Sequence, residues 1–272
     1  MNKEIFKLIE ENIIKLSTTE IGNLYDYFNY KNREQDITYI QSKEKIHPNQ
    51  EIPENTYLLG IDLPFWFGKF DSDTKIMIIG IDPLRNEYSF EKEEADKVNN
   101  VIIGTPFALH SKKIREGRTK QYWNFIEKLS QKNFVYLTDI YKTFFYTDSS
   151  KKNRSYNFYK KHKLNKYADI LINEIEIIKP DIIITLGDIA SNKLKAIKIQ
   201  DDIEVLKMVH LSGATRMKHK NKFVFDKLGR EKKESECFGL LYAEIINNII
   251  KEISNNENHP TLYPRSRLGP KF

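Results

Sequence analysis

The chain has 272 residues, a formal net charge of +6 and a single cysteine, Cys237. One cysteine excludes a disulfide within the chain and any iron–sulfur or metal site built from several cysteines. The positive charge favours a polyanionic partner such as nucleic acid, although a basic surface can also serve solubility alone. We expect a cytoplasmic protein, because the start of the chain lacks a signal-peptide apolar core and no apolar run approaches the roughly 18 residues that span a bilayer.

The chain divides into three predicted segments. Apolar residues recur at helical spacing over 5–16 and again over 21–28, which predicts two helices near the start of the chain. We therefore expect a helical extension over residues 1–70 that packs on the core. A main domain is predicted over 71–254, and a basic tail that contains prolines over 255–272.

Four short, mainly apolar runs in the main domain predict strands. They occupy residues 76–79, 134–137, 182–186 and 205–209. Continuous apolar and β-branched runs are typical of parallel strands that are covered on both faces. Helical patterns separate these runs, so the sequence predicts an α/β fold with a four-stranded, mostly parallel sheet between layers of helices.

Ionisable side chains follow three of the four predicted strands. Asp82 comes after the turn at Gly80, Asp139 follows the second strand, and His210 follows the fourth. Because the carboxyl ends of parallel strands lie on one edge of a sheet, these side chains can converge there. The alternative for Asp82 is an ordinary turn, since Asp and Pro are both common turn residues.

Five short motifs, taken in order along the chain, resemble the uracil-DNA glycosylase superfamily. They are Gly80-Ile-Asp-Pro, Gly104-Thr-Pro-Phe, Leu137-Thr-Asp139, Lys179-Pro-Asp-Ile-Ile-Ile-Thr-Leu-Gly187 and His210-Leu-Ser. No single motif is specific, whereas five in this order are. The resemblance implies a small four-stranded parallel sheet between helices, and a DNA glycosylase that needs neither metal nor cofactor. We expect a monomer whose partner is DNA.

The resemblance also implies a catalytic pair. Breaking the bond between deoxyribose and base develops positive charge on the sugar and negative charge on the departing base. Asp82 matches the aspartate of the family's Gly-Gln-Asp-Pro motif and would orient or deprotonate water and stabilise the sugar cation. His210 matches the histidine of the family's His-Pro-Ser motif and would donate to O2 of the base, which must first leave the duplex stack.

The predicted base-binding residues are Ile81, Leu84, Phe107 and Asp139. Phe107 would stack on the flipped base, or it is an ordinary core aromatic. Asp139 stands where uracil-excising members carry Asn, and an ionised carboxylate only accepts hydrogen bonds, so it suits the N4 amino group of cytosine. A one-residue slip of this alignment would place Thr138 there instead. Leu84 replaces the tyrosine that crowds C5 of the base in the uracil-specific branch.

These departures predict a glycosylase for a modified cytosine. A substituent at C5, as in hydroxymethylated or glucosylated cytosine of phage DNA, would fit the smaller side chain and a role in antiphage defence. Excision of ordinary cytosine would damage the enzyme's own genome. One alternative is a uracil-DNA glycosylase of base-excision repair, in which Asp139 is protonated or misaligned. The other is a DNA-binding protein that has lost turnover, against which the intact Asp82 and His210 argue.

The loop after the fourth strand is expected to contact DNA. Ser212 matches the family's phosphate-contacting serine, although Ser212-Gly213 is also a simple turn. Arg216 or Met217 could fill the gap left by the flipped base. Lys218 and Lys220 are well placed to contact phosphates. The family's proline is replaced in this loop by leucine, so the loop is expected to be less rigid.

Overall fold

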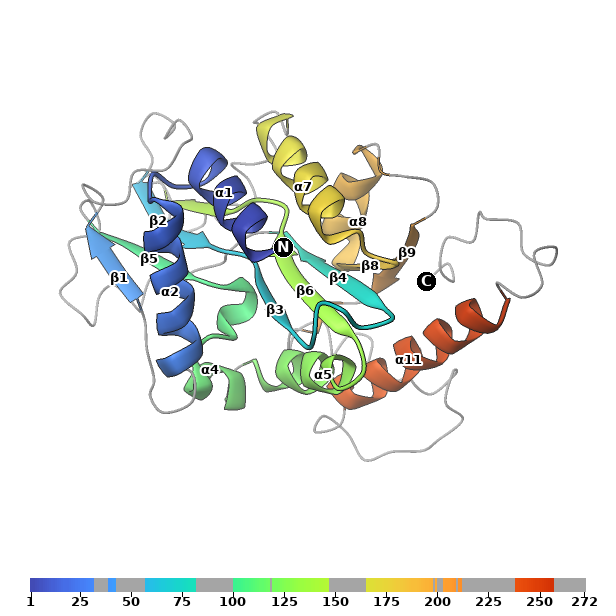
Figure 1. Cartoon of the computed structure of the whole chain (residues 1–272). Coiled ribbons are helices and arrows are strands. Elements are labelled where there is room, and N and C mark those ends of the chain that lie inside the picture. The colour runs from blue at the N-terminus through green and yellow to red at the C-terminus, as the bar shows by residue number, and fades with distance from the viewer. Residues whose placement is uncertain are drawn as a thin grey trace.

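The computed structural model of the protein describes residues 1–31, 39–42, 57–81, 100–117, 119–146, 165–197, 199, 203–208, 210–211 and 238–256 (Figure 1). The helices are α1 (Asn2–Asn12), α2 (Thr18–Lys31), η1 (Pro106–Ala108), α4 (Lys112–Glu116), α5 (Lys120–Ser130), α7 (Asn165–Ile178), α8 (Gly187–Lys195) and α11 (Phe238–Asn256). The strands are β1 (Tyr39–Ser42), β2 (Tyr57–Asp62), β3 (Phe65–Phe67), β4 (Lys75–Gly80), β5 (Asn100–Gly104), β6 (Phe134–Asp139), β7 (Thr143–Tyr146), β8 (Ile182–Leu186) and β9 (Glu204–Met208).

The central sheet has the strand order β3-β6-β4-β8-β9. Its strands β6, β4, β8 and β9 are parallel to one another, and they are the four strands predicted from the apolar runs. All residues of β6 and β8 are buried, as expected for strands that are covered on both faces. The one addition is the short strand β3, which pairs antiparallel with β6 at the edge of the sheet.

A second sheet, with the order β1-β5-β2-β7, continues from the first and was not predicted. Its strands β2 and β7 are connected along the chain to β3 and β6 of the central sheet (Figure 1). At this junction the backbone N–H of Asp62 donates to the carbonyl of Lys142 over 2.9 Å. The backbone N–H of Leu63 donates to the carbonyl of Gly104, also over 2.9 Å. These strands are short and follow aromatic or polar stretches, so periodicity alone gave no clear signal for them.

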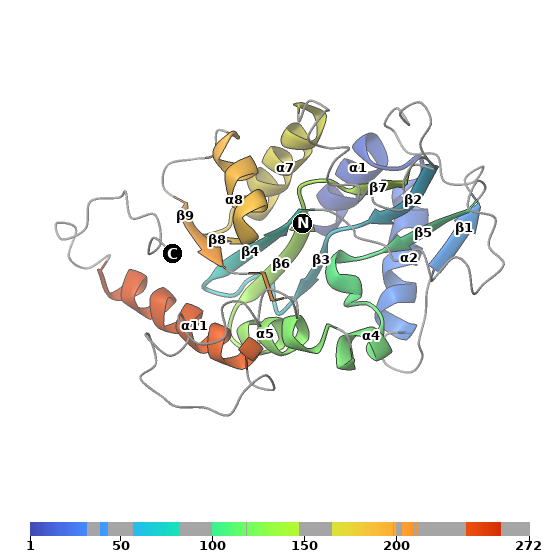
Figure 2. The ribbon, with the colours of Figure 1, turned by 180° about the vertical axis from the view of Figure 1, so that it is seen from behind.

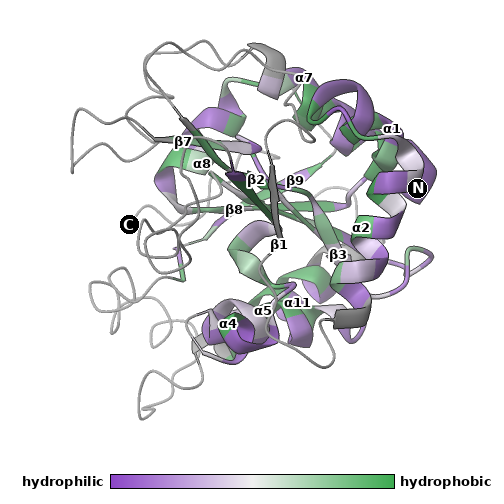
Figure 3. Cartoon of the chain, turned by 90° about the vertical axis from the view of Figure 1, so that its left-hand side faces the viewer, coloured by the Kyte–Doolittle hydropathy of each residue, from purple (hydrophilic) through white to green (hydrophobic). Residues whose placement is uncertain are grey.

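Two apolar clusters cover the two faces of the central sheet. On one face Met77, Ile79 and Tyr136 pack with residues of α1, α2, α7 and α8. On the other face Ile78 and Leu137 pack with residues of α5 and α11. Figure 3 shows the strands as the middle layer, with α1 and α7 above it and α5 and α11 below it. The predicted α/β sandwich is therefore confirmed.

The first two helices are as predicted, and aromatic contacts join them to the sheet. The hydroxyl of Tyr25 in α2 donates to the carbonyl of Pro64 over 2.5 Å, and its ring stacks on Trp66 of β3 at 5.0 Å. On the opposite face, α5 and α11 pack against each other (Figure 2). The boundary at residue 70 stays a prediction, and the expected tail lies almost wholly outside the described residues, because α11 ends at Asn256.

None of the helices in the described ranges combines the length and the hydrophobicity that crossing a bilayer requires.

Candidate active site

The carboxylate of Asp139 lies against Gly80 at the carboxyl edge of the sheet. The register of β4 on β6 pairs these two residues, and Asp139 is only 3% exposed. A Cβ atom added to Gly80 would overlap Oδ1 of Asp139 and would lie 3.4 Å from Cζ of the Phe107 ring. Glycine at this position leaves room for the carboxylate, because a side chain here would displace Asp139 from its present place.

Two backbone hydrogen bonds fix the chain where it leaves β4. The N–H of Ile140 donates to the carbonyl of Gly80 over 3.1 Å, and the N–H of Tyr141 donates to that of Ile81 over 3.0 Å. Ile81 is half-buried and packs against the apolar cluster of the α1 and α7 face. The position of Ile81, which directly precedes Asp82, is thus set by the segment that follows Asp139.

The structure describes only part of the predicted site. Ile81, Phe107, Asp139 and His210 are described, and all four lie at or near the carboxyl ends of the central strands. The others lie outside the described residues: Asp82, Leu84, Ser212, Gly213, Arg216, Lys218 and Lys220.

Phe107 is presented by a short loop with an unusual backbone. Phe107 and Ala108 both have positive φ values, of 59° and 53°. Non-glycine residues in this left-handed region are strained by about 1–2 kcal/mol each, so the surrounding contacts must hold the loop. Among them, the N–H of His110 donates to Oγ1 of the buried Thr105 over 3.2 Å. The Phe107 ring stacks on Tyr122 of α5, with centroids 4.2 Å apart and planes 11° from parallel.

His210 follows β9 and faces the same aromatic pair. The hydroxyl of Tyr122 lies 2.6 Å from its Nδ1 and 3.3 Å from its Nε2. The imidazole also meets Phe107 edge-on, with centroids 6.4 Å apart. A Cβ atom added to Gly187, which directly follows β8, would lie 3.7 Å from Cβ of His210. The histidine therefore lies next to the carboxyl end of β8.

Burial lowers the pKa of the His210 imidazole below its usual value of about 6.5. The side chain is therefore neutral near pH 7, with one ring nitrogen that donates a hydrogen bond and one that accepts.

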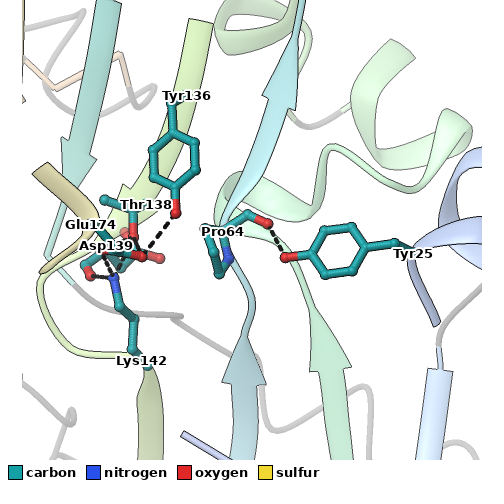
Figure 4. A network of polar contacts seen from close by, with 7 residues as sticks. All are labelled: Tyr25, Pro64, Tyr136, Thr138, Asp139, Lys142 and Glu174. Carbon is teal, nitrogen blue, oxygen red and sulfur yellow. Dashed lines mark hydrogen bonds and ion pairs between the residues drawn. The ribbon is translucent and has the colours of Figure 1, made fainter. Parts of the chain in front are cut away.

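A buried ion pair lies beneath Asp139 on the other face of the sheet (Figure 4). Nζ of Lys142 is 2.7 Å from Oε2 of Glu174 in α7, and the two side chains are 0% and 1% exposed. Lys142 also donates to the backbone carbonyl of Asp139 over 2.6 Å and to the hydroxyl of Thr138. The hydroxyls of Thr138 and Tyr136 donate to Glu174 over 3.0 Å and 3.1 Å. Burial, followed by the charge of Glu174, raises the pKa of Tyr136, which therefore stays a donor.

This network separates the roles of two neighbouring residues. Successive side chains of a strand point to opposite faces, so Thr138 faces α7 while Asp139 faces Phe107. Sequence reasoning missed both Lys142 and Glu174. The one available signal was Glu174, which interrupts the apolar stripe of α7 between Leu171 and Ile178.

The described part of the chain contains no group of three or more His, Cys, Asp or Glu side chains arranged to hold a metal ion.

Comparison with known proteins places the chain in a family. The family model of the Uracil DNA glycosylase superfamily matches residues 67–233, which is more than half of the chain and includes every predicted site residue. A search of curated proteins gives no significant match.

Replacing Lys142 by Met should lower the free energy of unfolding by about 3–5 kcal/mol, because Glu174 would be left as a buried charge without its cation. Adding Glu174→Gln should restore part of that loss. Urea unfolding measures both. The control is Lys7→Met, which breaks a pair with Glu11 whose side chains are 69% and 56% exposed, and should change stability by less than about 1 kcal/mol. Equal effects of Lys7→Met and Lys142→Met would contradict the interpretation.

The lowered pKa of His210 predicts a pH effect on stability. Below about pH 6.5 the unfolded chain takes up a proton at this residue while the folded protein does not, so stability is lost as the pH falls. The pH dependence of stability is compared with that of the His210→Gln variant, because a glutamine side chain does not take up a proton in this pH range. Between about pH 7.5 and 5.5 the wild-type protein should lose stability relative to this variant in urea unfolding. A constant difference, or a relative gain by the wild type, would be inconsistent with a half-buried histidine that stays neutral in the folded protein.

Proposed function

Because the chain belongs to the uracil DNA glycosylase superfamily, and is therefore a DNA N-glycosylase, we propose that the base it removes is a cytosine with a substituent at C5. The observation that carries this proposal is the buried carboxylate of Asp139, which lies against Gly80 at the sheet edge, where the Phe107 ring also approaches Gly80.

The carboxylate favours cytosine over uracil by its hydrogen-bonding capacity. An ionised carboxylate accepts hydrogen bonds and donates none. Cytosine offers its N4 amino group as a donor, whereas uracil presents the O4 acceptor at the same place. Two acceptors facing each other in a buried site leave both unsatisfied, at a cost of about 1–3 kcal/mol or more for a charged group. Asp139 would therefore select against uracil as well as for cytosine.

The position of the Phe107 ring supports the predicted role of Phe107 in stacking on the base. Tyr122 lies parallel to it and covers one face. We propose that the flipped base stacks on the opposite face, next to the Asp139 carboxylate. Stacking of a base on an aromatic side chain contributes about 1–3 kcal/mol. The strained backbone of the loop is consistent with a ring that is held in place for binding.

The proposed chemistry is hydrolysis between Asp82 and His210. The C1′–N1 bond breaks as a water oxygen attacks C1′, and the electron pair leaves with the base. Asp82 would take the proton of that water and stabilise the sugar cation. Neutral His210 would donate a hydrogen bond to O2, where negative charge develops. Its lowered pKa and its place beside Phe107 support this role, and Ile81 holds the start of the segment that carries Asp82.

The remaining assignments rest on the sequence. Leu84, in place of a tyrosine, would leave room for a C5 substituent such as hydroxymethyl or glucosylated hydroxymethyl, as found in phage DNA, and Ile81 would line the base. Contacts to DNA are assigned to the loop residues Ser212, Gly213, Arg216, Lys218 and Lys220. We propose that the protein acts as a cytoplasmic monomer, without an iron–sulfur cluster, in defence against phage. Uracil excision in repair is the alternative, and it would require a protonated Asp139.

Duplexes that carry uracil, cytosine, hydroxymethylcytosine or glucosylated hydroxymethylcytosine test the substrate directly. We expect abasic sites only in the duplexes with modified cytosine. Asp139→Asn should then gain uracil excision, because an amide accepts from N3–H and donates to O4, and should shift the ratio of rates towards uracil by about tenfold or more.

Asp139→Ala is the matched control, since it removes the carboxylate without supplying an amide. It should lose activity on modified cytosine and gain none on uracil. Excision of uracil alone by the wild-type protein would overturn the role given to Asp139, and DNA binding without any abasic product would favour a protein that has lost turnover.

A further inference from the structure

We propose that Tyr122 is a positioning residue that fixes the tautomer and the orientation of His210, so that Nε2 carries the proton that is offered to the base. The proposal rests on the function proposed above for His210. It adds a residue that the sequence alone did not single out as functional.

Tyr122 contacts two of the described residues that would surround the flipped base, Phe107 and His210. It lies in α5 and is 5% exposed. Its ring stacks on Phe107 at 4.2 Å, and its hydroxyl is 2.6 Å from Nδ1 of His210. Phe107 comes from the loop after β5 and His210 from the end of β9, so Tyr122 connects two segments that are far apart in the sequence.

The hydrogen bond decides which ring nitrogen holds the proton. A neutral imidazole has one N–H and one bare nitrogen, and the partner of one nitrogen selects the state of the other. The hydroxyl of Tyr122 is closer to Nδ1, at 2.6 Å, than to Nε2, at 3.3 Å. If the hydroxyl donates to Nδ1, the proton of His210 must be on Nε2.

The opposite arrangement would disable the histidine. With the proton on Nδ1, the imidazole would donate to the tyrosine oxygen and present a bare Nε2 to O2 of the base. Two acceptors would then face each other where negative charge develops in the transition state. The productive tautomer has a bare Nδ1 that needs a hydrogen-bond donor. A tyrosine hydroxyl can donate, so Tyr122 can supply that hydrogen bond.

The ring of Tyr122 keeps the hydroxyl in place. It packs in the apolar cluster between α5, α11 and the sheet, with Phe125 and Ile126 of its own helix. The stack on Phe107 restrains the ring on one side. Because contacts within the protein hold the Tyr122 ring and hydroxyl, His210 can be oriented before the base arrives, which lowers the reorganisation that catalysis requires.

Tyr122→Phe is the direct test, because it removes only the hydroxyl and retains the ring that stacks on Phe107. In ¹⁵N NMR spectra of histidine-labelled protein, wild-type His210 should show a bare Nδ1 and a protonated Nε2, whereas the variant should show a mixture of tautomers. The single-turnover rate on the best substrate among the four duplexes should fall at least about tenfold. The affinity for that duplex should change by less than about twofold.

The control is Tyr25→Phe, which removes a buried tyrosine hydroxyl on the other face of the sheet, where it donates to Pro64. It should leave the tautomer of His210 and the rate unchanged. Tyr122→Phe with an unchanged tautomer would overturn the proposal, whether or not the rate falls. His210→Gln with a wild-type rate would instead overturn the function proposed for His210, so the two failures can be told apart.

Discussion

The ion pair between Lys142 and Glu174 holds the end of β6, and the rest of the site depends on it. Lys142 has three N–H donors, and they go to Thr138, the carbonyl of Asp139 and Glu174. Glu174 accepts in turn from Lys142, Thr138 and Tyr136. Two buried charges are tolerated only when their hydrogen-bonding capacity is satisfied in this way. These hydrogen bonds fix the backbone around Asp139 on the face of the sheet that α7 covers. The Asp139 carboxylate lies on the opposite face of the sheet.

The absence of a side chain at Gly80 determines what that carboxylate can reach. Parallel pairing brings Gly80 beside Asp139, and the space of the missing Cβ is filled by Oδ1. Two further contacts hold the other described site residues at this edge of the sheet. Phe107 stacks on Tyr122, and the hydroxyl of Tyr122 contacts His210. A hydrogen-bond acceptor, an aromatic ring and a neutral imidazole are thus held by separate elements in one region. This is the kind of preorganised arrangement that glycosidic bond cleavage with a flipped base requires.

The fold was largely predictable, because three of the four parallel strands, β4, β6 and β8, are mainly apolar runs such as Ile182–Leu186, whose burial on both faces leaves a clear pattern. That Asp139 and His210 lie near one sheet edge also followed from the topology. The partners of these residues did not. Lys142 and Glu174 are separated by 32 positions, and Tyr122 and His210 by 88, so packing alone brings them together. The roles of all the predicted site residues stay predictions, and Asp82, Leu84 and the loop after Leu211 lie outside the described residues.

The most direct test of the central claim is a crystal structure with a duplex that carries a non-hydrolysable analogue of hydroxymethylated deoxycytidine. We expect a flipped base whose N4 lies about 2.7–3.2 Å from the Asp139 carboxylate, with its ring parallel to Phe107 and its O2 next to Nε2 of His210. A base bound elsewhere, or one that presents an edge other than N4 to Asp139, would contradict the role proposed for Asp139.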